Sequence, residues 1–159
     1  MRNYVIGDIH GCLDELRYLI DGLPLEVGDR LVFLGDYIDR GPNSRGVVSY
    51  LLELKDYGPA LDLVFLKGNH EDMLLSYLGL PGNYGDMFFY NGGKETLASY
   101  GLSSSHLTAH DALSVIPPAH LQFYQSLIDY YIMGDILCVH AGIPPLKPLE
   151  EQTATEVLW

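Results

Sequence analysis

Apolar positions along the chain follow two periods, and their order predicts an α/β fold. Short continuous apolar runs have the character of buried strands. The stretches after them repeat apolar residues every three or four positions, as one face of a helix does. The predicted strands cover residues 4–7, 31–34, 61–66 and 136–139. Because strands and helices alternate through the first half of the chain, we expect a largely parallel sheet with right-handed crossovers.

Capping residues, prolines and glycines set the limits of the predicted helices. The first helix starts at Leu13 and closes at Pro24, and Asn43 or Ser44 caps the second. Gly58-Pro59 ends that second helix. The other predicted elements are helices over residues 73–78, 94–100 and 117–128, a hairpin that joins residues 130–132 to 136–139, and the start of a helix in residues 150–159.

Residues 81–101 interleave glycine with tyrosine and phenylalanine. Such a segment can form a lid over a substrate, because loops carry function more often than their length suggests. More commonly, its aromatic side chains pack over the edge of the core. The pattern therefore favours packing over a lid.

Polar residues beside glycine follow each of the four predicted strands. The segments are Asp8-Ile9-His10-Gly11, Gly35-Asp36-Tyr37-Ile38-Asp39-Arg40-Gly41, Gly68-Asn69-His70-Glu71 and His140-Ala141-Gly142. Taken singly, each is also typical of a simple turn, since Asp and Gly favour turns. Sites in α/β sheets assemble at the carboxyl ends of strands, so the repetition at four strand ends predicts one shared site.

The residue types in these segments indicate a divalent metal and a phosphate. Mixed carboxylate, amide and imidazole ligands suit Mn, Fe, Zn or Ni better than Ca. A carboxylate such as Asp36 can bridge two ions about 3.5–4 Å apart, and such a pair lowers the pKa of bound water towards about 7. Arg40 offers a planar fork for phosphate oxygens. His70 can serve as a ligand or as a general acid.

Composition narrows the class of protein. The chain has 159 residues, which is the size of one domain, and a formal net charge of −12 with a pI near 4.6. This charge argues against nucleic acid or an anionic membrane as partner. Cys12 and Cys138 show neither a disulfide framework nor thiolate zinc spacing, and we expect both to be buried, reduced thiols.

The chain also lacks the hydrophobic segments of exported or membrane proteins. Asp8 interrupts the first apolar stretch before it reaches the length of a signal peptide. No run approaches the roughly 20 apolar residues that span a bilayer. We therefore expect a cytoplasmic protein.

The first three motifs, with about 25 residues between them as βα units require, resemble the phosphoprotein phosphatase family of metallophosphoesterases. With His140-Ala141-Gly142, the chain resembles the bacterial and phage-type serine/threonine phosphatases over residues 4–142. The resemblance implies one calcineurin-like phosphoesterase domain over residues 1–159. Its implied fold is an α-β-β-α sandwich of two mixed sheets flanked by helices. The implied activity is that of a metal-dependent phosphomonoesterase acting on a phosphorylated protein or a small phosphoester.

The resemblance also implies a role for each site residue. Two divalent ions are implied, Mn foremost. The implied metal ligands are Asp8 and His10 for the first ion, Asp36 as the bridge, and Asn69 and His140 for the second ion. His70 would be the general acid, oriented by Asp39 as carboxylates commonly orient imidazoles. Arg40 and Asn69 would bind the phosphate.

The sequence departs from the family pattern at its end. The family completes the second metal site with another histidine and adds a second arginine after a tryptophan. No histidine or arginine follows His140, and the sequence stops at Leu158-Trp159. We expect these residues to be the N-terminal part of a longer protein, without the last strands of the second sheet.

Two other functions stay open. Symmetrical dinucleoside tetraphosphate hydrolysis belongs to a related branch that shares the run His140-Ala141-Gly142-Ile143, although that branch more often has Asp where Glu71 stands. A metal- or phospho-binding module without catalysis is the other alternative. Three remaining histidines (His106, His110 and His120) are expected at the surface or in caps, and Lys67 as a solvated lysine at a strand end.

Overall fold

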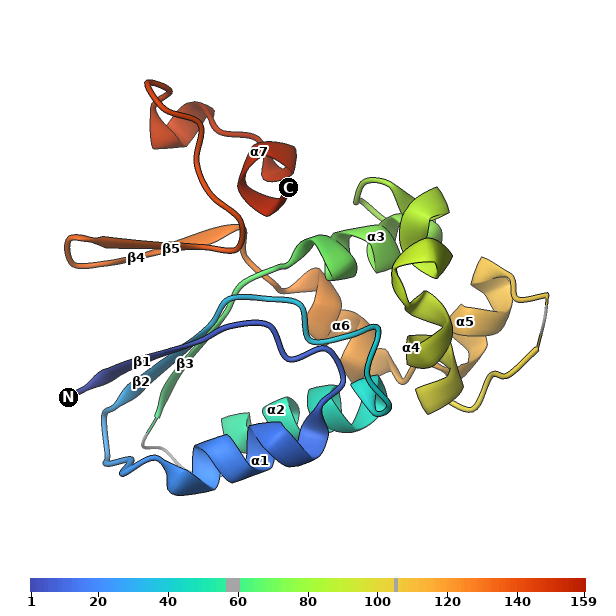
Figure 1. Ribbon diagram of the computed structural model, residues 1–159, viewed down its shortest axis with the longest axis horizontal. Helices are drawn as coiled ribbons and strands as arrows, with labels where there is room; N and C mark the ends of the chain where they lie inside the picture. The colour runs from blue at the N-terminus through green and yellow to red at the C-terminus, as the bar shows by residue number, and fades with distance from the viewer. Residues whose placement is uncertain (57–60, 105) are drawn as a thin grey trace.

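The computed structural model describes residues 1–56, 61–104 and 106–159 and has an α/β fold (Figure 1). The strands are β1 (Asn3–Ile6), β2 (Arg30–Phe33), β3 (Asp62–Phe65), β4 (Tyr130–Met133) and β5 (Ile136–Val139). The α-helices are α1 (Leu13–Gly22), α2 (Ser44–Asp56), α3 (Asn69–Tyr77), α4 (Gly93–Ser99), α5 (Ala109–Val115), α6 (Pro118–Gln125) and α7 (Ala154–Leu158). Two 3₁₀ helices, η1 (Gly85–Asn91) and η2 (Leu149–Glu151), complete the elements.

The first three strands form a parallel sheet in the order β1-β2-β3, as the alternation of strands and helices predicts. Ile6, Phe33 and Phe65 lie in register across it. Helices α1 and α2 cover one face, while α3, α4, α5 and α6 gather beyond one end (Figure 1). All three carboxyl ends therefore open towards the same group of helices.

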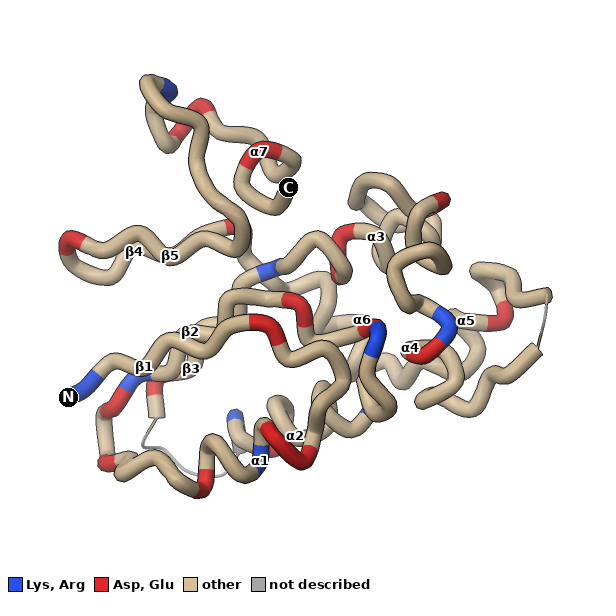
Figure 2. Tube along the Cα trace, viewed as in Figure 1, with Lys and Arg blue, Asp and Glu red and all other residues tan. Residues whose placement is uncertain are grey.

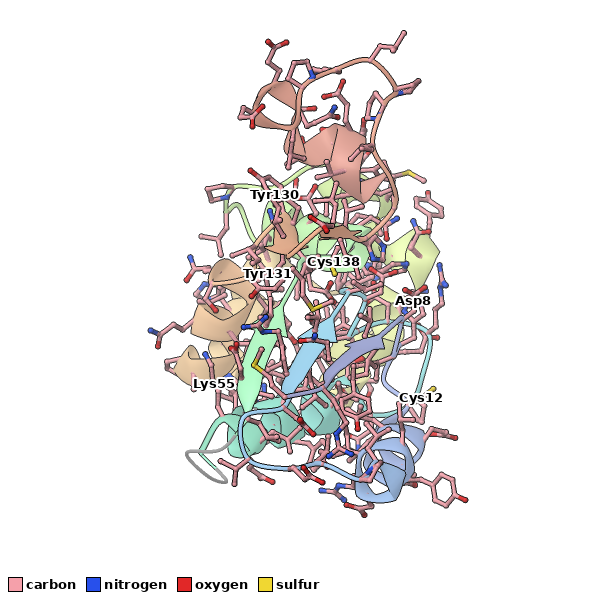
Figure 3. The ribbon with its side chains drawn as sticks, turned by 90° about the vertical axis from the view of Figure 1, so that its left-hand side faces the viewer. Asp8, Cys12, Lys55, Tyr130, Tyr131 and Cys138 are labelled. Atoms are coloured by element: carbon pink, nitrogen blue, oxygen red, sulfur yellow. The ribbon has the colours of Figure 1, made fainter. Side chains whose placement is uncertain are left out.

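A second layer covers the other face of this sheet. Leu31 and Phe33 of β2 belong to the main core, whereas Val32 between them packs with Leu66 and Cys138. The antiparallel hairpin β4-β5 carries Cys138, and Figure 3 shows its labelled residues alongside the sheet. The sheet, the hairpin and the outer helices form an α/β architecture of two β layers flanked by helices, as the resemblance implies. In the described residues the first sheet is parallel and the second antiparallel, so neither is mixed as expected.

Most predicted helices are confirmed, with one omission. The sequence analysis did not predict helix α5, although a capping box marks its start: Thr108 accepts a hydrogen bond from the Asp111 N–H. The predicted stop at Gly58-Pro59 lies outside the described residues. Within the described part of the chain, no helix is long and apolar enough to cross a membrane.

Gly35 joins β2 to the site loop in a conformation that needs glycine. Its φ is +105°, and a Cβ there would overlap the backbone of Gly68. We expect Gly35→Ala to lower the free energy of unfolding by at least about 2 kcal/mol, because strain and overlap add. Urea unfolding measures this. Gly22→Ala is the matched control, because Gly22 ends α1 with no atom near its Cβ position. Equal stability of the two variants would contradict the prediction.

Candidate metal centre and active site

The loops that follow β1 and β2 are held together by backbone hydrogen bonds. The N–H groups of Ile9 and His10 donate to the carbonyl of Asp36 over 3.0 and 2.8 Å, and Gly11 N–H donates to the carbonyl of Tyr37 over 2.9 Å. Asp8, labelled in Figure 3, follows β1 at this end of the sheet. The first two predicted motifs therefore form one structural unit.

Four site residues adopt left-handed backbone conformations. They are His10, Asp36, Asp39 and Arg40, with φ values of 44°, 54°, 68° and 64°. Such conformations cost of order 1–3 kcal/mol each and persist where the surroundings enforce them. Their concentration in two short loops indicates that the side chains are held in place by the fold.

Asp36 is the centre of this arrangement. Its Oδ2 atom lies 3.5 Å from Nε2 of both His10 and His140, and 3.8 Å from Nε2 of His70. Its Oδ1 atom accepts the backbone N–H of His70 over 3.1 Å. A buried carboxylate that faces three imidazole nitrogens has the position expected of a bridging ligand.

Two groups of potential ligand atoms share Asp36. One contains His10, Asp36 and His70, and the other contains Asp8, Asp36 and His140, with the atoms of each group within 4.8 Å of one another. In the described residues, predicted ligands from the ends of β1, β2 and β5 thus meet in space. Two ions sharing one carboxylate fit this donor set.

Hydrogen bonds on the far side of the two rings support this fit. Nδ1 of His10 lies 2.8 Å from the carbonyl of Ile38, and Nδ1 of His140 lies 2.9 Å from the carbonyl of Leu34. A carbonyl only accepts, so each Nδ1 carries the proton and each Nε2 keeps its lone pair. Metal-binding histidines are typically oriented in this way. Asn69, half-buried at the start of α3, stays a predicted ligand.

His70 and Asp39 form a buried pair. Nδ1 of His70 lies 2.7 Å from Oδ2 of Asp39, and the side chains are 1% and 0% exposed. Burial raises the pKa of Asp39, while hydrogen bonds from His70 and Thr96 oppose this shift. The pairing leaves Nε2 of His70 directed towards Asp36 and Arg40, and its role as general acid stays a prediction.

Arg40 brings positive charge to this acidic cluster. Its guanidinium donates to Nε2 of His10 over 2.9 Å and to Nε2 of His70 over 3.0 Å. A metal ion and Arg40 therefore compete for the His10 nitrogen. Arg40 is exposed, so a phosphate in solution can reach its side chain. Acidic residues outnumber basic ones across the chain, 21 to 9. Figure 2 shows where the acidic residues (red) and the basic residues (blue) lie along the trace.

Glu71 has a role that the sequence reasoning did not assign. Its fully buried carboxylate accepts the backbone N–H groups of Asp36, Tyr37, Ile38 and Gly68 over 2.8–3.3 Å. Burial, together with the Asp36 carboxylate, raises the pKa of Glu71, and the backbone donors oppose the rise. Glu71 thus ties α3 to the loop that carries Asp36. The sequence held one signal for this role, because Glu71 stands at the third position of α3, where Glu often caps the start of a helix.

Three minor predictions have different outcomes. His106 and His110 are exposed, as expected. His120 is buried, with Nδ1 2.7 Å from the Tyr100 hydroxyl, so its predicted surface position is wrong. Lys67 is 15% exposed and lies 2.9 Å from Asp129, so it is paired and not solvated. Polar partners explain both differences: Asp72 and Asp129 flank Lys67, and the hydroxyls of Tyr100 and Ser49 bond the ring of His120.

The aromatic segment after α3 packs against the protein. Phe88 is fully buried and stacks on Tyr77 with a centroid distance of 5.1 Å. The carbonyl of Gly92 accepts the backbone N–H of Arg40 over 3.4 Å. The packing alternative therefore describes Phe88, while Tyr90 remains exposed.

Cys12 and Cys138 are free thiols, and Cys138 is buried as predicted. Cys12 is only half-buried, at the N-cap of α1. In the described residues, neither cysteine belongs to the groups that could hold a metal. Both groups consist of carboxylate oxygens and imidazole nitrogens.

Comparisons with known proteins identify the family of the chain. The profile of the "Calcineurin-like phosphoesterase" family matches residues 1–159. A "Bis(5'-nucleosyl)-tetraphosphatase, symmetrical" of Cellvibrio japonicus is 31% identical over 97% of this chain and 50% of its own length. "Bis(5'-nucleosyl)-tetraphosphatase PrpE [asymmetrical]" of Bacillus velezensis is 34% identical over 87% of this chain and 55% of its own length.

A solved structure shows the same fold. It is a crystal structure of "a putative diadenosine tetraphosphatase", 26% identical, with a TM-score of 0.69 over 99% of this chain and 57% of that one. The chain spans about half the length of the curated relatives named above. The match over residues 1–159 shows that the chain belongs to the calcineurin-like phosphoesterase family.

Proposed function

We propose that this chain carries the metal centre of a dinucleoside tetraphosphate hydrolase. The observation that carries the proposal is the Asp36 carboxylate, which two groups of ligand atoms share beside the His70–Asp39 pair. Such a centre suits in-line displacement at phosphorus. The substrate class rests on relatives that are named bis(5'-nucleosyl)-tetraphosphatases.

In this proposal the cofactors are two divalent ions, Mn²⁺ foremost, held by Asp8, His10, Asp36, Asn69 and His140. When bound, they supply a hydroxide nucleophile and neutralise phosphate charge. Arg40 turns its guanidinium to the phosphate oxygens. His70, whose Nδ1–H donates to Asp39, gives a proton from Nε2 to the leaving oxygen. Asp39 stabilises the charged imidazole that makes this transfer possible.

Phosphomonoester hydrolysis on a phosphorylated protein is the second candidate. Glu71 favours it, because the tetraphosphatase branch more often has Asp at this position. The two candidates share the metal ligands and differ in the leaving group. A binding module without turnover is the third outcome that the same assay resolves.

Mn²⁺-dependent hydrolysis of diadenosine tetraphosphate by this chain tests the proposal. Symmetrical cleavage adds one water and yields two ADP, whereas asymmetrical cleavage yields ATP and AMP. We expect ADP as the nucleotide product and loss of turnover with a chelator. Turnover of a phosphoserine peptide without cleavage of the dinucleotide would overturn the substrate class. Metal binding without turnover of either compound would favour the binding module.

A further inference from the structure

Helix α4 contacts the His70–Asp39 pair through one buried side chain. The hydroxyl of Thr96 donates to Oδ1 of Asp39 over 2.6 Å, and Oδ2 of the same carboxylate accepts Nδ1–H of His70 over 2.7 Å. Thr96 and Asp39 are both 0% exposed. Both oxygens of the buried carboxylate thus have a defined donor.

The hydrogen-bonding capacity of Thr96 is fully used at this point. A hydroxyl has one proton to donate and two lone pairs to accept with. The proton goes to Asp39, whose N–H donates back to the Thr96 oxygen over 2.8 Å. The Ser44 hydroxyl lies 3.0 Å from that oxygen and occupies the second lone pair. A threonine that only stabilised its own helix would bond a carbonyl one turn back.

The start of the same helix also contacts the residue after Asp39. The carbonyl of Gly92, the N-cap of α4, accepts the N–H of Arg40. A Cβ at Gly92 would lie 2.6 Å from the Arg40 nitrogen, so the approach needs glycine. One turn of α4 therefore supports both Asp39 and Arg40, which are themselves in left-handed conformations.

We propose that Thr96 is a positioning residue, which holds the Asp39 carboxylate so that it accepts Nδ1–H of His70, while the second proton of the imidazolium, on Nε2, faces the reacting oxygen. The role of His70 in this inference rests on the function proposed above. The orientation of the Asp39–His70 pair does not depend on it. Thr96 acts through Asp39 and does not touch the substrate.

Three variants separate this role from simple packing. Thr96→Val keeps the shape of the side chain and removes the hydroxyl, while Thr96→Ser keeps the hydroxyl. Ser99→Ala is the matched control, because Ser99 lies on the same helix and bonds the Arg45 N–H and the Thr96 carbonyl without contacting Asp39. Thr96→Ala replaces the valine variant if the latter does not fold.

The first readout is the ¹⁵N-edited NMR signal of the His70 ring in metal-free protein. We expect a downfield Nδ1–H resonance that Thr96→Val shifts or broadens and that Thr96→Ser and Ser99→Ala preserve. An unchanged resonance in folded Thr96→Val would overturn the proposal. Because this measurement needs no turnover, failure of the proposed function leaves the test of Thr96 intact.

The second readout compares the turnover of two substrates that differ in their leaving groups, measured with metal-loaded protein. We expect Thr96→Val to lower kcat by about 10- to 100-fold for phenyl phosphate, the range for residues that orient site histidines. Turnover of p-nitrophenyl phosphate, whose leaving group needs little protonation, should change far less. Thr96→Ser should restore phenyl phosphate turnover. Equal losses on both substrates, or no rescue by serine, would contradict the positioning role.

Discussion

Asp36→Asn is expected to remove most Mn²⁺ binding and to lower turnover by more than about 10²-fold. Substituting a residue that merely orients a metal ligand lowers metal affinity or activity by about 10- to 100-fold. Asp36 should have a larger effect, because it faces the ligand nitrogens of His10 and His140 directly. The change replaces one anionic oxygen by a neutral amide nitrogen that cannot bind a cation. Isothermal titration with Mn²⁺ and turnover of p-nitrophenyl phosphate measure the two effects.

The backbone at Asp36 makes asparagine the suitable replacement. Its φ of 54° is a conformation that Asn tolerates well, and the amide oxygen can still accept the His70 N–H. The fold should therefore survive. Asp135→Asn, the same chemical change in the exposed hairpin turn, is the control and should leave both readouts unaltered. Retained Mn²⁺ binding and turnover in Asp36→Asn would refute a bridging role.

The parallel sheet and the convergence of the site were predictable because both depend on local patterns. The strand-helix alternation determines that the three strands run parallel, and parallel strands bring Asp8, Asp36 and Asn69 to one edge. His140 joins them through a hairpin that the Gly134-Asp135 turn predicts. Helix α5 was missed because its apolar face is short, although its capping box was visible in the sequence.

The contacts that hold the site residues in place were not predictable from motif spacing. Thr96 reaches Asp39 across 57 positions of the chain, and this contact depends on where α4 packs. Glu71 stands in a predicted motif, yet its four backbone partners come from two separate loops. Periodicity places a residue on an element, whereas these roles depend on how distant elements meet.

The residues of the metal centre also do not determine the class of substrate. Asp36, His10 and His140 would serve a monoester or an anhydride equally well, because both reactions begin with attack at phosphorus. The same site is therefore compatible with the resemblance to serine/threonine phosphatases and with relatives that are named tetraphosphatases. The leaving group is the chemical feature that separates the two reactions, and in the proposed mechanism His70 is the residue that protonates it.

His70→Asn is expected to lower turnover of a phosphoserine peptide by about 10²- to 10⁴-fold, the range for loss of a general acid. Serine leaves as a strongly basic alkoxide that needs a proton. ADP leaves from diadenosine tetraphosphate through a phosphate oxygen, a weak base with a pKa near 6. Loss on the dinucleotide should therefore be less than about 10-fold, and p-nitrophenyl phosphate should behave like the dinucleotide.

The comparison across leaving groups also separates two roles for His70. Its Nε2 atom lies 3.8 Å from Asp36 Oδ2, within a group that could bind a metal. If His70 were a metal ligand, His70→Asn would weaken Mn²⁺ binding and reduce all three rates together. His120→Asn is the matched control, because this buried histidine contacts Tyr100 and Ser49 and lies outside both ligand groups. Unequal losses with unchanged Mn²⁺ affinity would identify His70 as the proton donor. Its Nδ1–H bond to Asp39 would then stabilise the imidazolium that carries the transferred proton on Nε2.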